Sequence, residues 1–145
     1  KNRPSACRTY PLERGVEKMA NGELQSRYFL TQHDYCKGHL EDYSYTVKRW
    51  ERGQQLFEYN LLNDLWAEVD AFLASNPWQG EGQAGPRQQL AFMVCYNIDA
   101  FREYAQEHNL LKSARLDRER RRRIERDDVE LLKFGFEWLV QVLRE

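Results

Sequence analysis

Three residues with metal-binding side chains lie close together in the first third of the chain: His33, Cys36 and His39. Imidazole and thiolate groups are good zinc ligands, and a spacing of three residues puts His33 and Cys36 on one face of a helix. A structural zinc site normally has four ligands, and no second pair of histidines or cysteines accompanies these three. The three residues are therefore considered as metal ligands, but the pattern favours an ordinary polar helix end without a cofactor.

Arginine and histidine stand six positions apart twice, at Arg102 and His108 and at Arg27 and His33. Such a pair suits phosphate chemistry, because arginine can stabilise developing charge while histidine transfers protons. The spacing resembles the signature of HEPN-type ribonucleases, which are small helical domains. The resemblance implies that Arg102 and His108 are catalytic residues at a helix junction that act on RNA. Glu103, which follows the first arginine, departs from the residue usual at that place in the family.

The most basic part of the chain, residues 115–126, contains seven arginines and three acidic residues. Such a segment could bind phosphate groups, and its affinity would then fall with salt. However, no aromatic side chain is interspersed to stack on bases, and the acids can pair with the arginines along a helix. The segment favours a solvated helix or connector with charge pairing along its surface. A further alternative is that its arginine forks dock an acidic protein partner. The arginines considered for partner binding are Arg118, Arg120, Arg121, Arg122 and Arg123.

Trp78 lies in the clearest loop of the sequence, residues 76–86, which is rich in glycine and proline. No helical periodicity assigns this tryptophan to a core. It is therefore a candidate anchor for a partner protein, with a position over the end of a helix bundle as the alternative.

The pattern of apolar residues predicts the elements that would position these side chains. Apolar residues recur at three- and four-residue steps from Leu40 to Phe72, which predicts one long central helix over about residues 39–74. Pro11 and the pair Asn21-Gly22 fit the start and stop of an earlier helix, and a further helix is expected from residue 23 to about residue 38. Asp127 begins a capping box at the start of the last helix.

These patterns together predict an all-α fold. Its form would be a compact bundle of five to six helices with no significant sheet. A length of 145 residues suits a single domain over residues 1–145. The first nine residues would form an irregular tail.

Charge and cysteine content limit the partners and the compartment. The net charge of −1 gives no overall field toward DNA or a membrane, and no apolar run approaches the roughly 20 residues of a membrane helix. Cys7, Cys36 and Cys95 do not form a disulfide framework. Reduced thiols and a cytoplasmic location are favoured, with a Cys36–Cys95 disulfide in a periplasmic or secreted protein as the alternative.

Because no catalytic constellation stands out, the sequence favours binding over catalysis. The hypothesis is a non-catalytic protein–protein interaction module of the inhibitor, immunity, chaperone or adaptor type, which acts by surface docking. The alternatives are a nucleic-acid-binding regulator that uses Arg115–Arg126 and a HEPN-like helical ribonuclease. The sequence leaves open the identity of the partner and whether the chain forms homo-oligomers.

Overall fold

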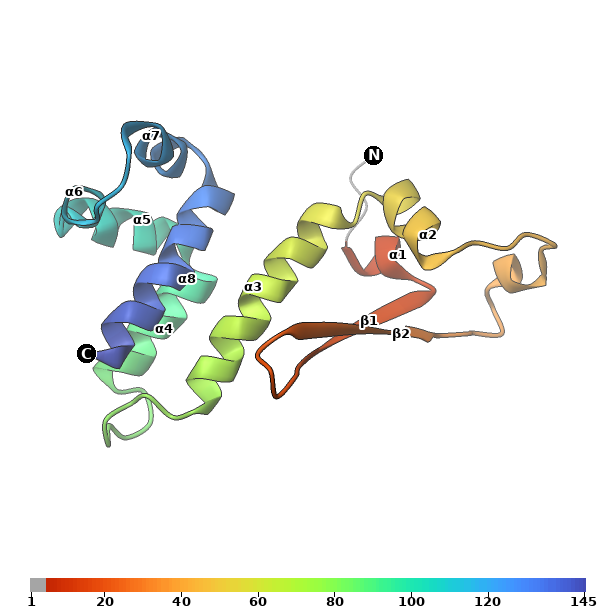
Figure 1. Cartoon of the computed structure of the whole chain (residues 1–145), viewed down its shortest axis with the longest axis horizontal. Coiled ribbons are helices and arrows are strands. Elements are labelled where there is room, and N and C mark those ends of the chain that lie inside the picture. The colour runs from red at the N-terminus through yellow and green to blue at the C-terminus, as the bar shows by residue number, and fades with distance from the viewer. Residues whose placement is uncertain (1–4) are drawn as a thin grey trace. The chain divides into compact units, whose positions relative to one another are not determined.

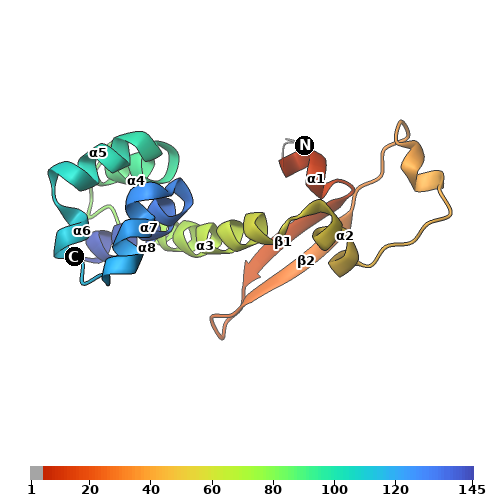
Figure 2. The same ribbon diagram turned by 90° about the horizontal axis from the view of Figure 1, so that it is seen from above.

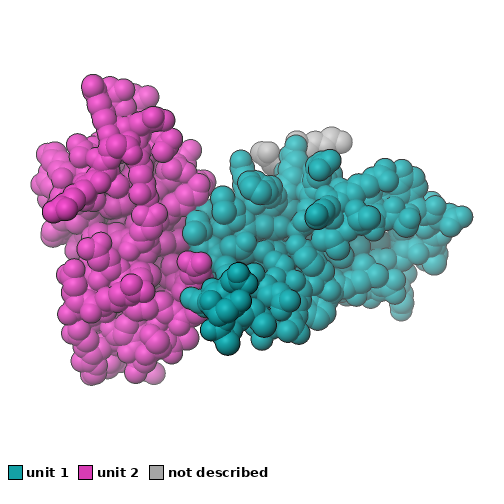
Figure 3. Space-filling model, viewed as in Figure 1, with its two compact units in different colours: residues 1–67 teal, residues 68–145 magenta. Residues whose placement is uncertain are grey.

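The computed structural model describes residues 5–145 of the chain (Figure 1). Eight α-helices and one two-stranded antiparallel sheet are found among these residues. The chain divides into two compact units, residues 1–67 and residues 68–145, which Figure 3 colours separately. The prediction of a single domain over residues 1–145 stays a prediction.

The first unit contains a β-hairpin, so the prediction of an all-α fold with no significant sheet is wrong. Helix α1 (Ser5–Thr9) occupies part of the predicted irregular tail, whose first four residues lie outside the described part of the chain. Strands β1 (Leu12–Lys18) and β2 (Leu24–Leu30) follow and pair antiparallel.

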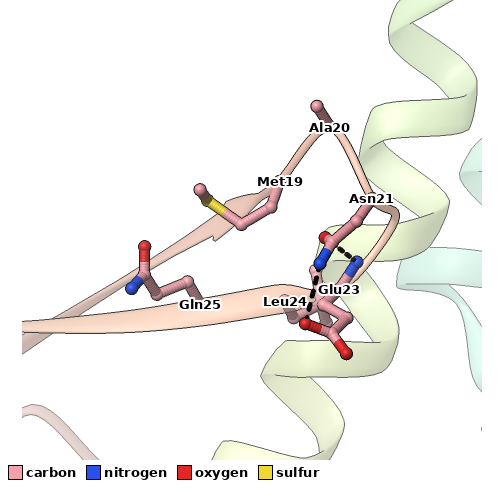
Figure 4. A pocket seen from close by; sticks show the side chains of 6 residues that line it. All are labelled: Met19, Ala20, Asn21, Glu23, Leu24 and Gln25. Atoms are coloured by element: carbon pink, nitrogen blue, oxygen red, sulfur yellow. Dashed lines mark hydrogen bonds between the residues drawn. The ribbon is translucent and has the colours of Figure 1, made fainter.

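The hairpin closes at Asn21-Gly22, the dipeptide that the sequence analysis interprets as a helix stop. The Gly22 N–H donates to the Met19 carbonyl and the Met19 N–H to the Glu23 carbonyl, each over 2.8 Å. Gly22 has a φ of 85°, which glycine adopts without steric cost. Figure 4 shows the shallow hollow at this turn, where the Asn21 amide donates to the Glu23 carboxylate over 2.9 Å. These two polar side chains are therefore hydrogen-bonded to each other at the turn.

The predicted long helix over residues 39–74 is also wrong. A 3₁₀ turn (Lys37–Leu40) is followed by extended chain, then by α2 (Val47–Gln54) and α3 (Phe57–Ala74). The break lies at Gln55, which has a φ of 57°, and not at Gly53. The Leu56 N–H donates to the Glu51 carbonyl over 3.0 Å and the Leu56 side chain is buried, as in a helix stop of the Schellman type.

One face of the hairpin is fastened to α2 and α3 by polar side chains. Arg14 pairs with Asp64 of α3 over 2.7 Å and donates to the Ser26 hydroxyl over 2.7 Å. The Tyr28 hydroxyl donates to Glu51 of α2 over 2.8 Å. Because Arg14, Ser26 and Tyr28 share one face of the paired strands, the hairpin is held by ion pairs and hydrogen bonds rather than by an apolar core.

The second unit is a helical bundle, as predicted for this part of the chain (Figure 2). Helix α8 (Asp128–Arg144) packs against α4 (Pro86–Tyr96), α5 (Ile98–Glu107) and α7 (Arg118–Arg126), and α6 (Leu110–Ser113) follows α5. The Asp127 carboxylate caps α8 by accepting from the Val129 and Glu130 N–H groups, over 2.8 and 3.0 Å, where the capping box is predicted. The largest fully buried side chains of the described residues all belong to this bundle: Val94, Phe101, Ile124, Leu131 and Leu139.

Gly135 lets the helices of this bundle approach closely. A Cβ atom at this position would lie 2.8 Å from Cε1 of Phe101 and 2.9 Å from Cγ1 of Val94. Real Cβ atoms do not approach neighbours so closely, so glycine is required where α8 crosses α4 and α5.

Candidate docking surface

The longest loop of the described chain joins β2 to α2 and covers residues 31–46; we call it the aromatic loop. It contains one short 3₁₀ turn, and loops of this length with so little regular structure are uncommon unless they have a function. Its apolar side chains point into solvent: Tyr35 is 79% exposed, Leu40 80% and Tyr43 63%. The loop ends at Thr46, whose hydroxyl caps α2 by accepting from the Arg49 N–H over 3.2 Å.

The exposure of apolar side chains is concentrated in the first unit. Ten of the fourteen exposed large apolar residues described lie between residues 28 and 61. Eleven of the twelve buried apolar residues described lie between residues 69 and 143, and Leu56 is the twelfth. The first unit thus has little core of its own in its described part, whereas the second is well packed. Exposed apolar side chains are typical of interaction sites where they gather into one patch.

Three rings at the C-terminal end of the aromatic loop hold one another in place. The ring centroids of Tyr43 and Tyr45 lie 5.2 Å apart, and Tyr45 meets Trp50 edge to face at 5.4 Å. The Arg49 guanidinium lies 5.6 and 5.2 Å from the Tyr43 and Tyr45 ring centroids and donates to the Tyr43 hydroxyl over 3.2 Å. The exposed tyrosines are therefore held by ring and cation contacts within the chain.

A cavity of about 720 Å³ lies under the aromatic loop. Trp50 forms part of its wall and donates from Nε1 to the Thr9 carbonyl over 3.2 Å. Tyr10 and His39 meet on another wall, with 2.7 Å between the Tyr10 hydroxyl and Nε2 of His39. Burial and a hydrogen bond with Cys36 raise the pKa of Tyr10, so its hydroxyl stays protonated at neutral pH.

Two of the predicted metal ligands, Cys36 and His39, belong to the lining of this cavity. His33 stacks on Tyr10 and on Tyr35, with ring centroids 5.7 and 5.0 Å apart, while His39 binds the Tyr10 hydroxyl. No group of three or more histidine, cysteine, aspartate or glutamate residues in the described chain is arranged to hold a metal ion. His33, Cys36 and His39 belong to a loop and not to a helix end, so the expected helical face does not exist.

The three cysteines are free thiols, and the structure therefore contains no Cys36–Cys95 disulfide. Cys7 is exposed, and Cys36 is half-buried in the cavity wall. Burial raises the pKa of Cys95 to about 11, so this thiol is protonated and a poor nucleophile near neutral pH.

The two candidate catalytic residues, Arg102 and His108, have separate partners in the structure. Arg102 pairs with Asp128 and donates to the Glu125 carbonyl over 3.3 Å. His108 follows the last residue of α5, and its ring lies against Tyr104 at 4.2 Å between centroids. Six residues of an α-helix turn through roughly 600°, so the two side chains leave α5 about 120° apart.

The arginine-rich segment forms α7, and its arginines have different surroundings. Ile124 is buried, and Arg120 beside it binds both carboxylate oxygens of Glu137 over 2.7 Å. Arg123 pairs with Glu119 over 3.2 Å. Of the proposed partner-binding arginines, Arg120 therefore joins α7 to α8, whereas the pair of Arg123 with Glu119 lies within α7. Three exposed arginines recur every four residues on the outer side of α7 and have no ion pair within the described chain: Arg118, Arg122 and Arg126.

Trp78 is half-buried in the loop between α3 and α4, which begins and ends where the sequence predicts. Arg87 fastens this loop by donating to the Pro77 carbonyl over 3.4 Å and to the Leu143 carbonyl over 3.1 Å. Trp78 is thus part of a fastened loop, and the aromatic loop presents far more accessible apolar side chains.

Sequence reasoning missed the aromatic loop because its rings fall on helical spacing with those of α2. Its signal lies in composition: Tyr35, Tyr43 and Tyr45 occur among polar residues after an Asn-Gly hairpin.

Among the described residues, no helix combines the length and apolar character required to cross a membrane.

Comparison with known proteins adds no further assignment. The sequence matches no protein family model, no curated protein and no solved structure.

Proposed function

We propose that this chain is a non-catalytic protein-interaction module of the inhibitor or adaptor type, whose aromatic loop docks into an apolar cleft of a partner protein. The observation that carries the proposal is the exposure of Tyr35, Leu40 and Tyr43 on a loop of otherwise polar residues. Burial of such side chains supplies most of the free energy in protein interfaces, and tyrosine is enriched among the residues that dominate them. The well-packed second unit supports this proposal as a stable scaffold.

The contacts of the loop support the same proposal. Tyr43 and Tyr45 are fixed by Arg49 and Trp50, so they lose little conformational freedom when a partner covers them. Tyrosine also carries a hydroxyl that can form hydrogen bonds when the ring is buried against a partner.

The test is affinity capture from a native lysate with the full chain and two matched variants. Tyr35→Ser with Leu40→Ser is expected to reduce capture of the specific partner at least tenfold, because two exposed anchors are lost without any change in the second unit. Phe92→Ser, at a 64% exposed position in α4, is the control and is expected to capture as the unchanged chain does. The proposal would be refuted if Tyr35→Ser with Leu40→Ser captured the partner as well as the unchanged chain does, or if Phe92→Ser abolished capture.

A second candidate function rests on the outer arginines of α7. Arg118, Arg122 and Arg126 stand about 6 Å apart along the helix axis, because four residues rise by that distance. Three unpaired cations in a row can each neutralise one phosphate of a nucleic acid.

We expect this stripe, if it binds nucleic acid, to show a defined salt dependence. Replacing all three arginines by alanine should lower the slope of log affinity against log salt by about 2–3 for a short single strand. The control replaces three exposed cations of the first unit, Lys37, Lys48 and Arg52, by alanine, with the same change in charge. Binding measured by fluorescence anisotropy that weakens equally in both variants would rule out a specific role for α7.

A further inference from the structure

A second cavity, independent of the aromatic loop, lies in the helical bundle of the second unit. Its volume is about 510 Å³, and residues of α5, α6, α7 and α8 line it. Three of the lining side chains are cationic, Arg102, Lys112 and Arg121, whereas Glu125 is the one acidic residue in the described lining. A cavity with such an excess of positive charge favours an anionic ligand.

Arg121 provides an independent sign of a missing partner. Its Nε atom is buried and has no hydrogen-bond partner in the described structure. A buried donor without an acceptor is unfavourable, and more so when the group is charged, so such groups are rare in folded proteins. Arg121 precedes the fully buried Ile124 by one helical turn, which fixes its position beside the cavity.

The other cations of the cavity have distinct roles. Arg102 is held by Asp128 and by the Glu125 carbonyl, so its charge is partly offset and its position is fixed. Lys112 is exposed at the end of α6 and has no ion pair in the described chain, so it is available to a ligand. Arg121 and Lys112 are therefore the cations that would contact an anion directly.

The remaining lining indicates what the anion is attached to. Leu111, Ile124 and Leu131 give the cavity apolar walls, and Gln106 and Asn109 add amide groups. A volume of about 510 Å³ exceeds the size of inorganic phosphate and falls in the usual range for small organic ligands. We propose that this cavity binds a phosphate monoester, with Arg121 and Lys112 on the phosphate and the apolar walls around its organic part.

The proposal is tested with adenosine monophosphate as the probe, by isothermal titration of the full chain at constant ionic strength. Binding at one site is expected, with adenosine at least tenfold weaker, because the phosphate makes the charged contacts. Arg121→Gln should weaken binding at least tenfold, whereas Lys48→Gln, with the same charge change at an exposed position of α2, should leave it unchanged. Lys112→Gln, at an exposed position, should also weaken binding and keeps the test valid if Arg121→Gln does not fold.

A 5′-phosphorylated trinucleotide distinguishes the two sources of this group. Tighter binding than the mononucleotide would assign the cavity to the end of a nucleic acid, and equal or weaker binding to a phosphorylated metabolite. Equal affinities for adenosine and its monophosphate, unchanged binding by both Arg121→Gln and Lys112→Gln, or no binding at millimolar concentration would overturn the proposal. None of these results depends on a protein partner, so this test and the test of the docking function fail separately.

Discussion

Replacing Arg14 by methionine is expected to lower the free energy of unfolding of the β-hairpin by about 2–4 kcal/mol. The Arg14 side chain is 14% exposed and that of Asp64 32%, so removing the arginine leaves a carboxylate largely desolvated and unpaired. Removal of one partner of a buried pair is far more harmful than removal of both, because the remaining charge has nothing to compensate its lost hydration. The effect should appear as faster hydrogen exchange in peptides that cover residues 12–30 of the full chain.

Arg27→Met is the matched control for this prediction. Arg27 pairs with Glu17 over 2.8 Å on the outer face of the same hairpin, but the two side chains are 59% and 57% exposed. Exposed pairs contribute about 0–1 kcal/mol, so little change is expected. The double variant Arg14→Met with Asp64→Leu should recover part of the loss. Equal effects of Arg14→Met and Arg27→Met would show that the inner ion pair does not hold the hairpin.

The second large effect is expected for Gly135→Ala in α8. The new methyl group would lie under 3.0 Å from Phe101 and Val94, so the packing of α8 against α4 and α5 must give way. Overpacking of this kind costs about 1–3 kcal/mol, which exceeds the helix propensity gain of up to about 1 kcal/mol. Urea unfolding should therefore have a lower midpoint and an unchanged slope.

Gly53→Ala is the control for this prediction, and the opposite effect on stability is expected. Gly53 lies in α2, and a Cβ atom there meets nothing within 4 Å. The gain in helix propensity should then keep or raise stability by up to about 1 kcal/mol. A loss of stability in Gly53→Ala as large as in Gly135→Ala would mean that close packing at Gly135 is not the cause.

The helices of the second unit could be predicted from sequence because local signals and tertiary packing agree there. Val94, Phe101 and Ala105 recur at helical spacing in the sequence, and all three are buried. Asp127 marks the start of α8 through its cap. The apolar pattern gives no signal for the boundary between α4 and α5, where the Asn97 side chain accepts from the Ala100 N–H over 3.2 Å and begins a new helix.

The hairpin could not be recognised from apolar alternation because its inner face carries polar residues. Leu12, Arg14 and Val16 lie on that inner face of β1, so a charged residue stands between the two apolar ones. Ser26 of β2 is paired with Val16 on the same face. Arg14 is stabilised there by Asp64, fifty residues later in the chain, and such a partner cannot be identified from one sequence. The Asn-Gly turn was the available signal, and it favours a hairpin whenever strand-like segments flank it.

The arginines of α7 show which part of a site the sequence can predict. The orientation of α7 follows from Ile124, whose side chain must face the core. The stripe of arginines on the outer side of the helix could therefore be found from spacing alone. The pairing of Arg120 with Glu137 and the unpartnered Nε of Arg121 depend on how α7 meets its neighbours. These contacts can be identified only once the three-dimensional structure is known.

The most direct test of the docking account is hydrogen exchange of the full chain, alone and with the partner recovered by capture. The account predicts that binding slows exchange at least tenfold in peptides that cover residues 31–46 and leaves peptides of α4, α5 and α8 unchanged. Protection confined to residues 86–143, with the aromatic loop as fast as in the free protein, would contradict it.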